Sequence, residues 1–291
     1  MSELRGAALI AAAGVGVSIG ATTVASKFVV GEVGPAGLTF LRYAIALICL
    51  LPFAALSSWR RLSFADFSAV AVLGIGQFAL LAGLFHFSLL YIPAGRAAVI
   101  FATIPLLTMG LAIALQREPR SLVKALAISA CVLGVAVAIG ERDILTHPRA
   151  WVGDLAAFGA AFTGAVCNVL YGTYTRRHGA RAVSALSMAP AVAVLLPVLL
   201  LIEGGAPAWG HLTVPVWAII CVTGIASAAG FLLLTWALAH APASDVAAFF
   251  SLGPIVATAL GVWLLGEAVT LQFLLGVALV SSGLWVALKA K

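Results

Sequence analysis

The chain has 291 residues, of which 63% are hydrophobic and only 9% are charged, and its mean hydropathy is +1.17. A soluble domain of this length exposes far more charge, so the composition excludes a soluble globular protein. A formal net charge of +6 would suggest nucleic-acid binding in a soluble protein, but the basic residues lie at the ends of apolar stretches, where they orient a membrane protein.

Apolar stretches of about 20 residues recur along the chain, and this is the length that crosses a bilayer as a helix. Using proline, glycine and charge clusters as boundaries, we predict ten helices near 6–29, 35–57, 66–90, 94–115, 121–139, 152–175, 181–203, 214–239, 243–264 and 268–288. The first span follows a short charged segment and is interpreted as a retained helix, without a cleaved signal peptide. The predicted fold class is an all-α membrane protein.

The first half of the chain is repeated in the second half at a constant offset of 149 residues. Over 89–139, 14 of the 51 aligned positions are identical, where composition alone would give roughly a tenth. The matched positions include residues that shape the backbone: Pro93 and Pro242, Pro105 and Pro254, Glu118 and Glu267, Gly134 and Gly283. We therefore predict two five-helix repeats, residues 1–145 and residues 146–291, around a central cavity.

The basic residues predict the orientation of these helices. With the N-terminus in the cytoplasm, eleven Lys and Arg residues fall near cytoplasmic ends and four on the other side, which places both termini in the cytoplasm. Five helices per repeat is an odd number, so the second repeat enters the membrane from the opposite side. Arg96 at the outer start of the fourth helix accordingly matches Asp245 at the inner start of the ninth. Inverted repeats of this kind suit alternating access.

Acidic residues are missing from the centres of the predicted spans, because all ten lie at helix ends or in loops. Proton-driven carriers usually keep a carboxylate there, so we favour transport down the gradient of the solute over obligate proton exchange. The sequence contains neither HExxH nor GxSxG, and the four cysteines lack metal-site spacing. We therefore predict no catalytic residues, metal or cofactor. An intramembrane enzyme is the alternative from a different class.

Polar and aromatic side chains near the span centres form the candidate substrate site. Gln77 and Phe78 are adjacent, while Asn168 and Tyr171 lie three apart on one helix face. The whole predicted set is Arg42, Gln77, Phe78, His86, Asn168, Tyr171, Trp236 and Ser251, with Ser18 and Thr22 as further polar groups on the first helix. An apolar cavity with few polar groups and several rings suits a neutral, partly aromatic organic solute.

Each of these residues also has a structural interpretation. Arg42 could reach the outer headgroups instead of anchoring a carboxylate, and His86 could be a hydrogen-bonded packing residue. Pro105 and Pro254 fall inside the fourth and ninth predicted helices, where a missing N–H bends a helix, so we predict them as hinges, with a static kink as the alternative.

The five-plus-five repeat and the paired Pro and Glu stretches resemble the drug/metabolite transporter superfamily. Within it, the chain is most similar to EamA-type exporters and to YddG-type exporters of aromatic amino acids. Further matching details are Lys27, the stretch from Pro35 to Arg42 and the GEAVT run at 266–270, whereas the Trp-Gly often seen in the first helix reads Ile19-Gly20 here.

The resemblance implies a basket of helices 1–4 and 6–9 around a central cavity, with helices 5 and 10 outside. It also implies export or facilitated movement of amino acids, aromatic and other neutral ones, across the bacterial inner membrane. A drug or metabolite exporter on the same frame is the alternative within this class. The expected partners are a small-molecule substrate and the lipid bilayer, with no nucleic acid, and the expected state is a monomer or homodimer.

Overall fold

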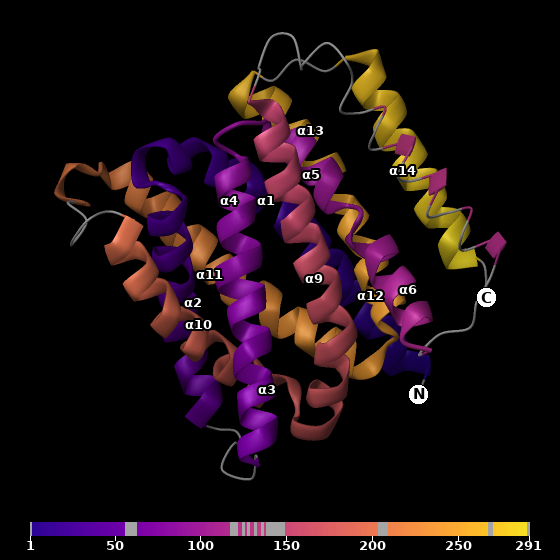
Figure 1. Cartoon of the computed structure of the whole chain (residues 1–291), viewed down its shortest axis with the longest axis horizontal. Helices are drawn as coiled ribbons and strands as arrows, with labels where there is room; N and C mark the ends of the chain where they lie inside the picture. The colour runs from indigo at the N-terminus through magenta and orange to yellow at the C-terminus, as the bar shows by residue number, and fades with distance from the viewer. Residues whose placement is uncertain are drawn as a thin grey trace.

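The described part of the chain is built from helices alone (Figure 1). The computed structural model describes residues 2–55, 63–116, 149–202, 209–266 and 270–289, together with short pieces between 122 and 137. Within these described residues, seven stretches are long and apolar enough to cross a membrane: Gly6–Val33, Pro35–Pro52, Phe64–Ser88, Ala94–Ala114, Ala150–His178, Ala180–Ile202 and Val214–His240. The prediction of an all-α, multi-pass membrane protein is confirmed.

The helices follow the predicted spans closely in both halves of the chain. The first half contains α1 Ser2–Val33, α2 Pro35–Ala55, α3 Phe64–Gly74, α4 Ala82–Ser88, α5 Ala94–Phe101 and α6 Ile104–Ala114. The second half contains α9 Ala150–His178, α10 Ala180–Ile202, α11 Val214–His240, α12 Ala243–Ala248, α13 Leu252–Leu265 and α14 Leu271–Lys289. The fifth predicted span, 121–139, falls largely outside the described residues, so a total of ten spans stays a prediction.

Single glycines separate two pairs of consecutive helices. Gly34 stands between α1 and α2 with φ of +77°, and Gly179 stands between α9 and α10 with φ of +83°. Glycine adopts this left-handed conformation without the steric cost of a Cβ, and it therefore ends a helix abruptly. Pro35 then occupies the first position of α2, where the missing N–H has no partner to lose.

Among the predicted spans that fall within the described residues, three are interrupted instead of continuous. The span over 64–88 contains a π-helical segment, η2 Ile75–Leu81, between α3 and α4. The span over 94–114 breaks at Ala102 and Thr103, and the span over 243–265 breaks at a 3-10 turn, η4 Phe249–Ser251. The two breaks lie at matching places under the offset of 149.

These breaks correct the prediction of bent but continuous helices at the two prolines. Pro105 is the second residue of α6, and Pro254 is the third residue of α13. A proline in the first turn of a helix has no intrahelical donor to lose, whereas in a helix interior it removes a hydrogen bond. Each proline therefore lies in the first turn of a new helix immediately after a break.

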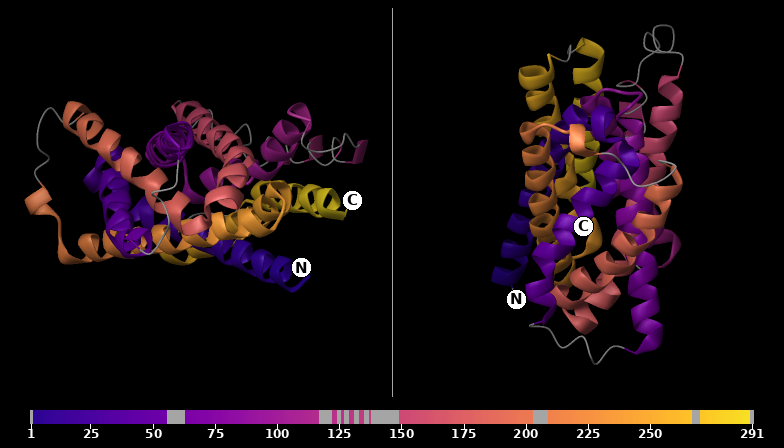
Figure 2. Two further views of the ribbon diagram at one scale, coloured as in Figure 1. Left: turned by 90° about the horizontal axis from the view of Figure 1, so that it is seen from below. Right: turned by 90° about the vertical axis from the view of Figure 1, so that its left-hand side faces the viewer.

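The two halves of the described chain interlock (Figure 2). Helix α1 packs mainly against α11 and α13, and α9 packs against α4, η2 and α6 in the corresponding way. Helix α2 lies against α10 and α11, also from the second half. Helix α14 stands at the edge of the bundle, where it contacts α12 and η4 (Figure 1). The apolar faces of each half are thus buried largely against the other half.

Glycines on α1 allow its backbone to approach α13 closely. A Cβ added at Gly16 would lie 2.0 Å from the carbonyl oxygen of Phe249, and one added at Gly20 would lie 2.5 Å from the carbonyl oxygen of Gly253. The spacing of these two glycines is the GxxxG pattern, which favours close contact between helices in a membrane. The break in the ninth predicted span is therefore packed directly on α1.

Ionic contacts connect helices at both ends of the bundle. Near the start of α5, Arg96 donates hydrogen bonds to both carboxylate oxygens of Asp154 on α9, at 2.8 and 2.5 Å. At the opposite end, Asp66 on α3 contacts Arg177 and His178 at the end of α9. The Arg96 side chain is only 5% exposed, while that of Arg177 is 68% exposed. The pair of Arg96 with Asp154 is thus buried, whereas Arg177 reaches Asp66 from an exposed position.

Candidate functional site

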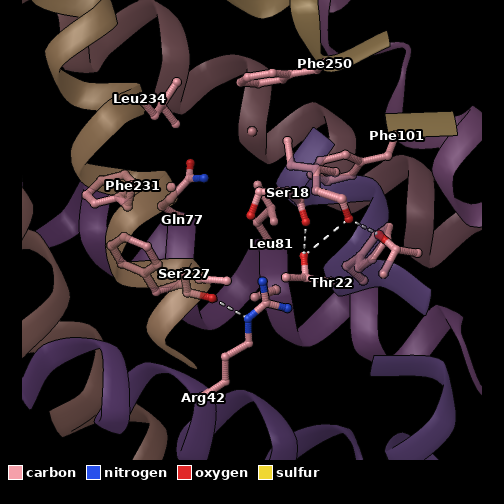
Figure 3. Close-up of a pocket in the computed structure, with 18 of the residues that line it drawn as sticks. Ser18, Thr22, Arg42, Gln77, Leu81, Phe101, Ser227, Phe231, Leu234 and Phe250 are labelled. Atoms are coloured by element: carbon pink, nitrogen blue, oxygen red, sulfur yellow. Dashed lines mark hydrogen bonds between the residues drawn. The ribbon is translucent and has the colours of Figure 1, made fainter. Parts of the chain in front are cut away.

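A cavity of about 120 Å³ lies at the meeting point of helices from the two halves (Figure 3). Its walls come from α1, α2, η2, α4, α5 and α6 of the first half and from α9, α11 and η4 of the second half. The lining is mostly apolar and aromatic, with a small number of polar groups, which is the usual character of a small-molecule site.

Most of the cavity wall follows the internal repeat of the sequence. Fourteen of the 22 lining residues form seven pairs that are separated by 149 positions. The pairs are Ile19 and Asn168, Gln77 and Ala226, Phe78 and Ser227, Leu81 and Gly230, Ala82 and Phe231, Phe85 and Leu234, and Phe101 and Phe250. Equivalent positions of the two sequence halves therefore face one cavity.

The structure brings five of the predicted site residues together in this wall: Arg42, Gln77, Phe78, His86 and Asn168. Ser18 and Thr22, the further polar groups proposed on the first helix, line it as well. These residues come from α1, α2, η2, α4 and α9, and only the folded chain places them side by side.

The other predicted residues are placed elsewhere. Tyr171 is fully buried behind the wall, where its ring packs on Phe231 with a centroid distance of 5.6 Å. Trp236 packs on the ring of His240 with a centroid distance of 4.7 Å and is not among the lining residues. Ser251 belongs to η4, and its side chain lies outside the described part of the structure.

Arg42 enters the cavity from α2, and its guanidinium is held by neutral groups. Its Nε donates to Ser227 Oγ, and its Nη1 donates to Ser26 Oγ at 3.4 Å and to His86 Nε2 at 3.3 Å. The guanidinium carbon also lies 5.8 Å from the ring centre of Tyr43. Figure 3 shows the guanidinium directed toward the open space from below. Arg42 thus faces the cavity.

The hydrogen bonds around His86 determine which of its ring nitrogens carries the proton. The Thr39 hydroxyl donates its single hydrogen to the carbonyl oxygen of Pro35, at 2.6 Å. His86 Nδ1, which lies 2.7 Å from Thr39 Oγ1, must therefore be the donor in that contact. Nε2 is then left to accept from Arg42. This pattern describes a neutral imidazole that orients Arg42.

Two carboxamide side chains in the wall have no hydrogen-bond partner among the described residues. They belong to Gln77 on η2 and Asn168 on α9, and each has a buried polar atom without a partner. Leaving such a group unpaired costs about 1–3 kcal/mol, so buried polar groups normally find a partner. These amides can donate to and accept from a solute in the cavity.

The π-helical segment is a feature that the sequence did not predict, since 66–90 reads as an ordinary apolar span. Gln77, Phe78 and Leu81 of this segment all line the cavity. Single π-helical turns inside α-helices are frequent at functional sites, because the wider turn redirects side chains. Here the segment contributes Gln77, one of the polar groups of the wall.

Aromatic rings make up much of the remaining wall. Phe78 packs on Tyr43 and on Phe231, with centroid distances of 4.8 and 4.5 Å, and Phe101 packs on Phe85 at 4.9 Å. Four further lining residues were not predicted from the sequence: Phe101, Phe231, Phe250 and Ser227. The identity of Phe101 and Phe250 under the offset of 149 was a signal that could have identified two of them.

Charged and metal-binding groups are few in this site. Arg42 carries the only fixed charge among the described lining residues, and none of those residues is acidic. Within the described ranges, no group of three or more His, Cys, Asp or Glu side chains could hold a metal ion. The described geometry is therefore suited to binding a small organic molecule through one cation, neutral amides and aromatic rings.

Comparisons with known proteins identify the family of the chain. The model of the EamA-like transporter family matches residues 6–140 and again residues 151–289. A protein of Clostridium kluyveri named "Uncharacterized transporter" is 23% identical over 260 residues, which cover 87% of this chain and 83% of that protein. A solved structure, described only as a crystal structure of a protein, has a TM-score of 0.71 over 100% of this chain and 98% of that chain, with 20% sequence identity. This last likeness concerns the fold alone.

Proposed function

Because the chain belongs to the EamA-like transporter family, we propose that it carries amino acids, aromatic and other neutral ones, through the cavity between its halves. The observation that carries this proposal is the cavity wall, in which both halves contribute rings and isolated polar groups around one small space. The volume of about 120 Å³ is below the range of about 300–1,000 Å³ typical of ligand pockets, which favours small solutes over large drugs.

The transport mechanism in this proposal is alternating access between two inverted halves, residues 1–145 and 146–291. The seven lining pairs at one sequence offset and the reciprocal packing of α1 and α9 support it, since equivalent halves can exchange roles. In the bacterial inner membrane, with both termini cytoplasmic, the carrier exports or equilibrates its solute. An exporter of drugs or other metabolites with the same fold is the alternative.

Purified protein in liposomes is expected to show downhill uptake and counterflow of amino acids without a pH gradient. The reason is that none of the described lining residues is acidic, and His86 is already engaged on both ring nitrogens. The measurement is uptake of a panel of amino acids, drugs and sugars, with and without an imposed pH difference, with protein-free liposomes as the control. Accumulation that requires the pH difference would contradict the expected energetics, and uptake confined to drugs would favour the alternative.

Pro105 and Pro254 are proposed as hinges, at which α6 and α13 move relative to α5 and α12. Replacing either proline with alanine supplies a backbone donor, which favours a continuous helix across the break. We expect each single variant to favour one facing state, and a bias of about 1.4 kcal/mol changes the ratio of the states tenfold. Because the halves are inverted, the double variant should restore part of the balance.

The readouts for the hinge variants are the transport rate and the sidedness of cysteine labelling. Pro197→Ala is the matched control, since Pro197 lies inside α10 and outside both breaks. Parental rates and unchanged labelling in both single variants and the double variant would show that the two prolines are static.

A further inference from the structure

The charge of Arg42 has no acidic counterpart within the described chain. All of its contacts are with neutral groups, namely Ser26, Ser227, His86 and the ring of Tyr43. A cation inside the membrane is costly unless an anion or water compensates it, and such residues are usually functional. A residue placed here for packing alone would not need a charge.

The guanidinium is also oriented so that one side stays available. Ser227 donates its own hydroxyl hydrogen to the carbonyl oxygen of Thr223, at 2.7 Å, so its Oγ can only accept from Arg42 Nε. Together with the neutral His86, this fixes the guanidinium through Nε and Nη1, while Nη2 has no partner among the described residues. The N–H groups of Nη2 can therefore donate charge-assisted hydrogen bonds to a carboxylate, and a fixed guanidinium presents them without further ordering.

The rest of the wall offers no matching site for a positive charge. None of the described lining residues is acidic, so an ammonium group would meet only neutral acceptors such as the carboxamides of Gln77 and Asn168. The apolar part of a solute would instead contact the rings of Phe78, Phe101 and Phe231. Only the acid end of an amino acid finds an opposite charge.

We propose that Arg42 binds the carboxylate of the solute and that the site selects small organic acids with an apolar or aromatic body, whether or not they carry an amino group. This inference rests on the proposed transport function and names the chemical class that its site accepts. A deaminated acid should then bind about as well as the amino acid, and the corresponding amine should bind poorly.

Three compounds with the same phenyl body test the inference: phenylalanine, 3-phenylpropionate and 2-phenylethylamine. We measure the Kd of each for the purified protein, together with counterflow in liposomes. Both acids should bind within a few-fold of each other, and the amine at least tenfold more weakly. Arg42→Gln should weaken both acids by about 10- to 100-fold, the range expected when a hydrogen bond to a charged group is lost, and should not weaken the amine. Arg42→Lys should retain part of the affinity.

Arg181→Gln is the matched control, because it removes an exposed positive charge from α10, away from the cavity. The inference is overturned if the amine binds as tightly as the acids, if no acid binds, or if Arg42→Gln binds the acids like the parent. If Arg42→Gln does not fold, the Kd values of the three compounds for the parental protein still test the inference. Binding of both acids without transport of phenylalanine would contradict the proposed function alone, whereas transport of phenylalanine with equal competition by the amine would contradict this inference alone.

Discussion

A Gly16→Ala variant is expected to lose several kcal/mol of stability from the addition of one methyl group. The added Cβ would lie 2.0 Å from the carbonyl oxygen of Phe249 and 3.0 Å from its carbonyl carbon, so it meets backbone and not a side chain that can rotate away. Overpacking of a tight contact typically costs about 1–3 kcal/mol, and a rigid backbone neighbour raises this cost. Helix α1 must then separate from α13 and from η4, and η4 also forms part of the cavity wall.

Gly14 on the same helix is the matched control. A Cβ at Gly14 would meet nothing within 4 Å, so Gly14→Ala should be neutral or should stabilise the helix by up to about 1 kcal/mol. The measurement is the apparent melting temperature in detergent, together with the monodisperse fraction in gel filtration. Equal behaviour of the two variants would mean that α1 does not pack against the break in the way described.

Breaking the buried ion pair between Arg96 and Asp154 is expected to have the second large effect. Asp154→Ala leaves the guanidinium of Arg96, whose side chain is 5% exposed, without this carboxylate. Removing one partner of a buried pair typically costs about 3–5 kcal/mol, because the remaining charge stays desolvated. Since the pair connects α5 to α9, its loss should also loosen the bundle at this end.

A double-mutant cycle separates the ion pair from simple loss of packing. Arg96→Asp combined with Asp154→Arg should recover part of the stability that either single change loses. Arg177→Ala serves as the control, because its pair with Asp66 is exposed and should contribute less than about 1 kcal/mol. If the exchanged pair is no more stable than either single variant, the contact between α5 and α9 does not depend on this ion pair.

Hydropathy and the positions of proline, glycine and charge clusters predicted the helical spans, because both are properties of the local sequence. The breaks near Pro105 and Pro254 were predicted only as bends, since a missing N–H is visible in the sequence but the turn that precedes it is not. The π-helical segment Ile75–Leu81 carries no comparable signal. Its geometry depends on packing against α9 and α10, which are distant in the sequence.

The candidate site was predictable where a polar residue stood alone in an apolar span, as with Gln77, Asn168 and Arg42. The contact of Arg42 with His86, and that of Arg42 with Ser227, could not be predicted, because each joins separate helices. Tyr171 and Asn168 share a helix face to within one turn, yet only Asn168 reaches the cavity. A helical spacing indicates a face of the helix but not which neighbouring helix covers it.

The interlocked packing of the two halves has a consequence for how the protein is made. Helix α1 ends at Val33, whereas α11, one of its main packing partners, begins at Val214. During synthesis, α1 and α2 therefore enter the bilayer long before the helices that pack against them exist. Until the ribosome has completed α11, the guanidinium of Arg42 on α2 lacks its partner Ser227, and lipid or water surrounds its charge. Assembly of this bundle thus depends on early helices that tolerate a period without their partners.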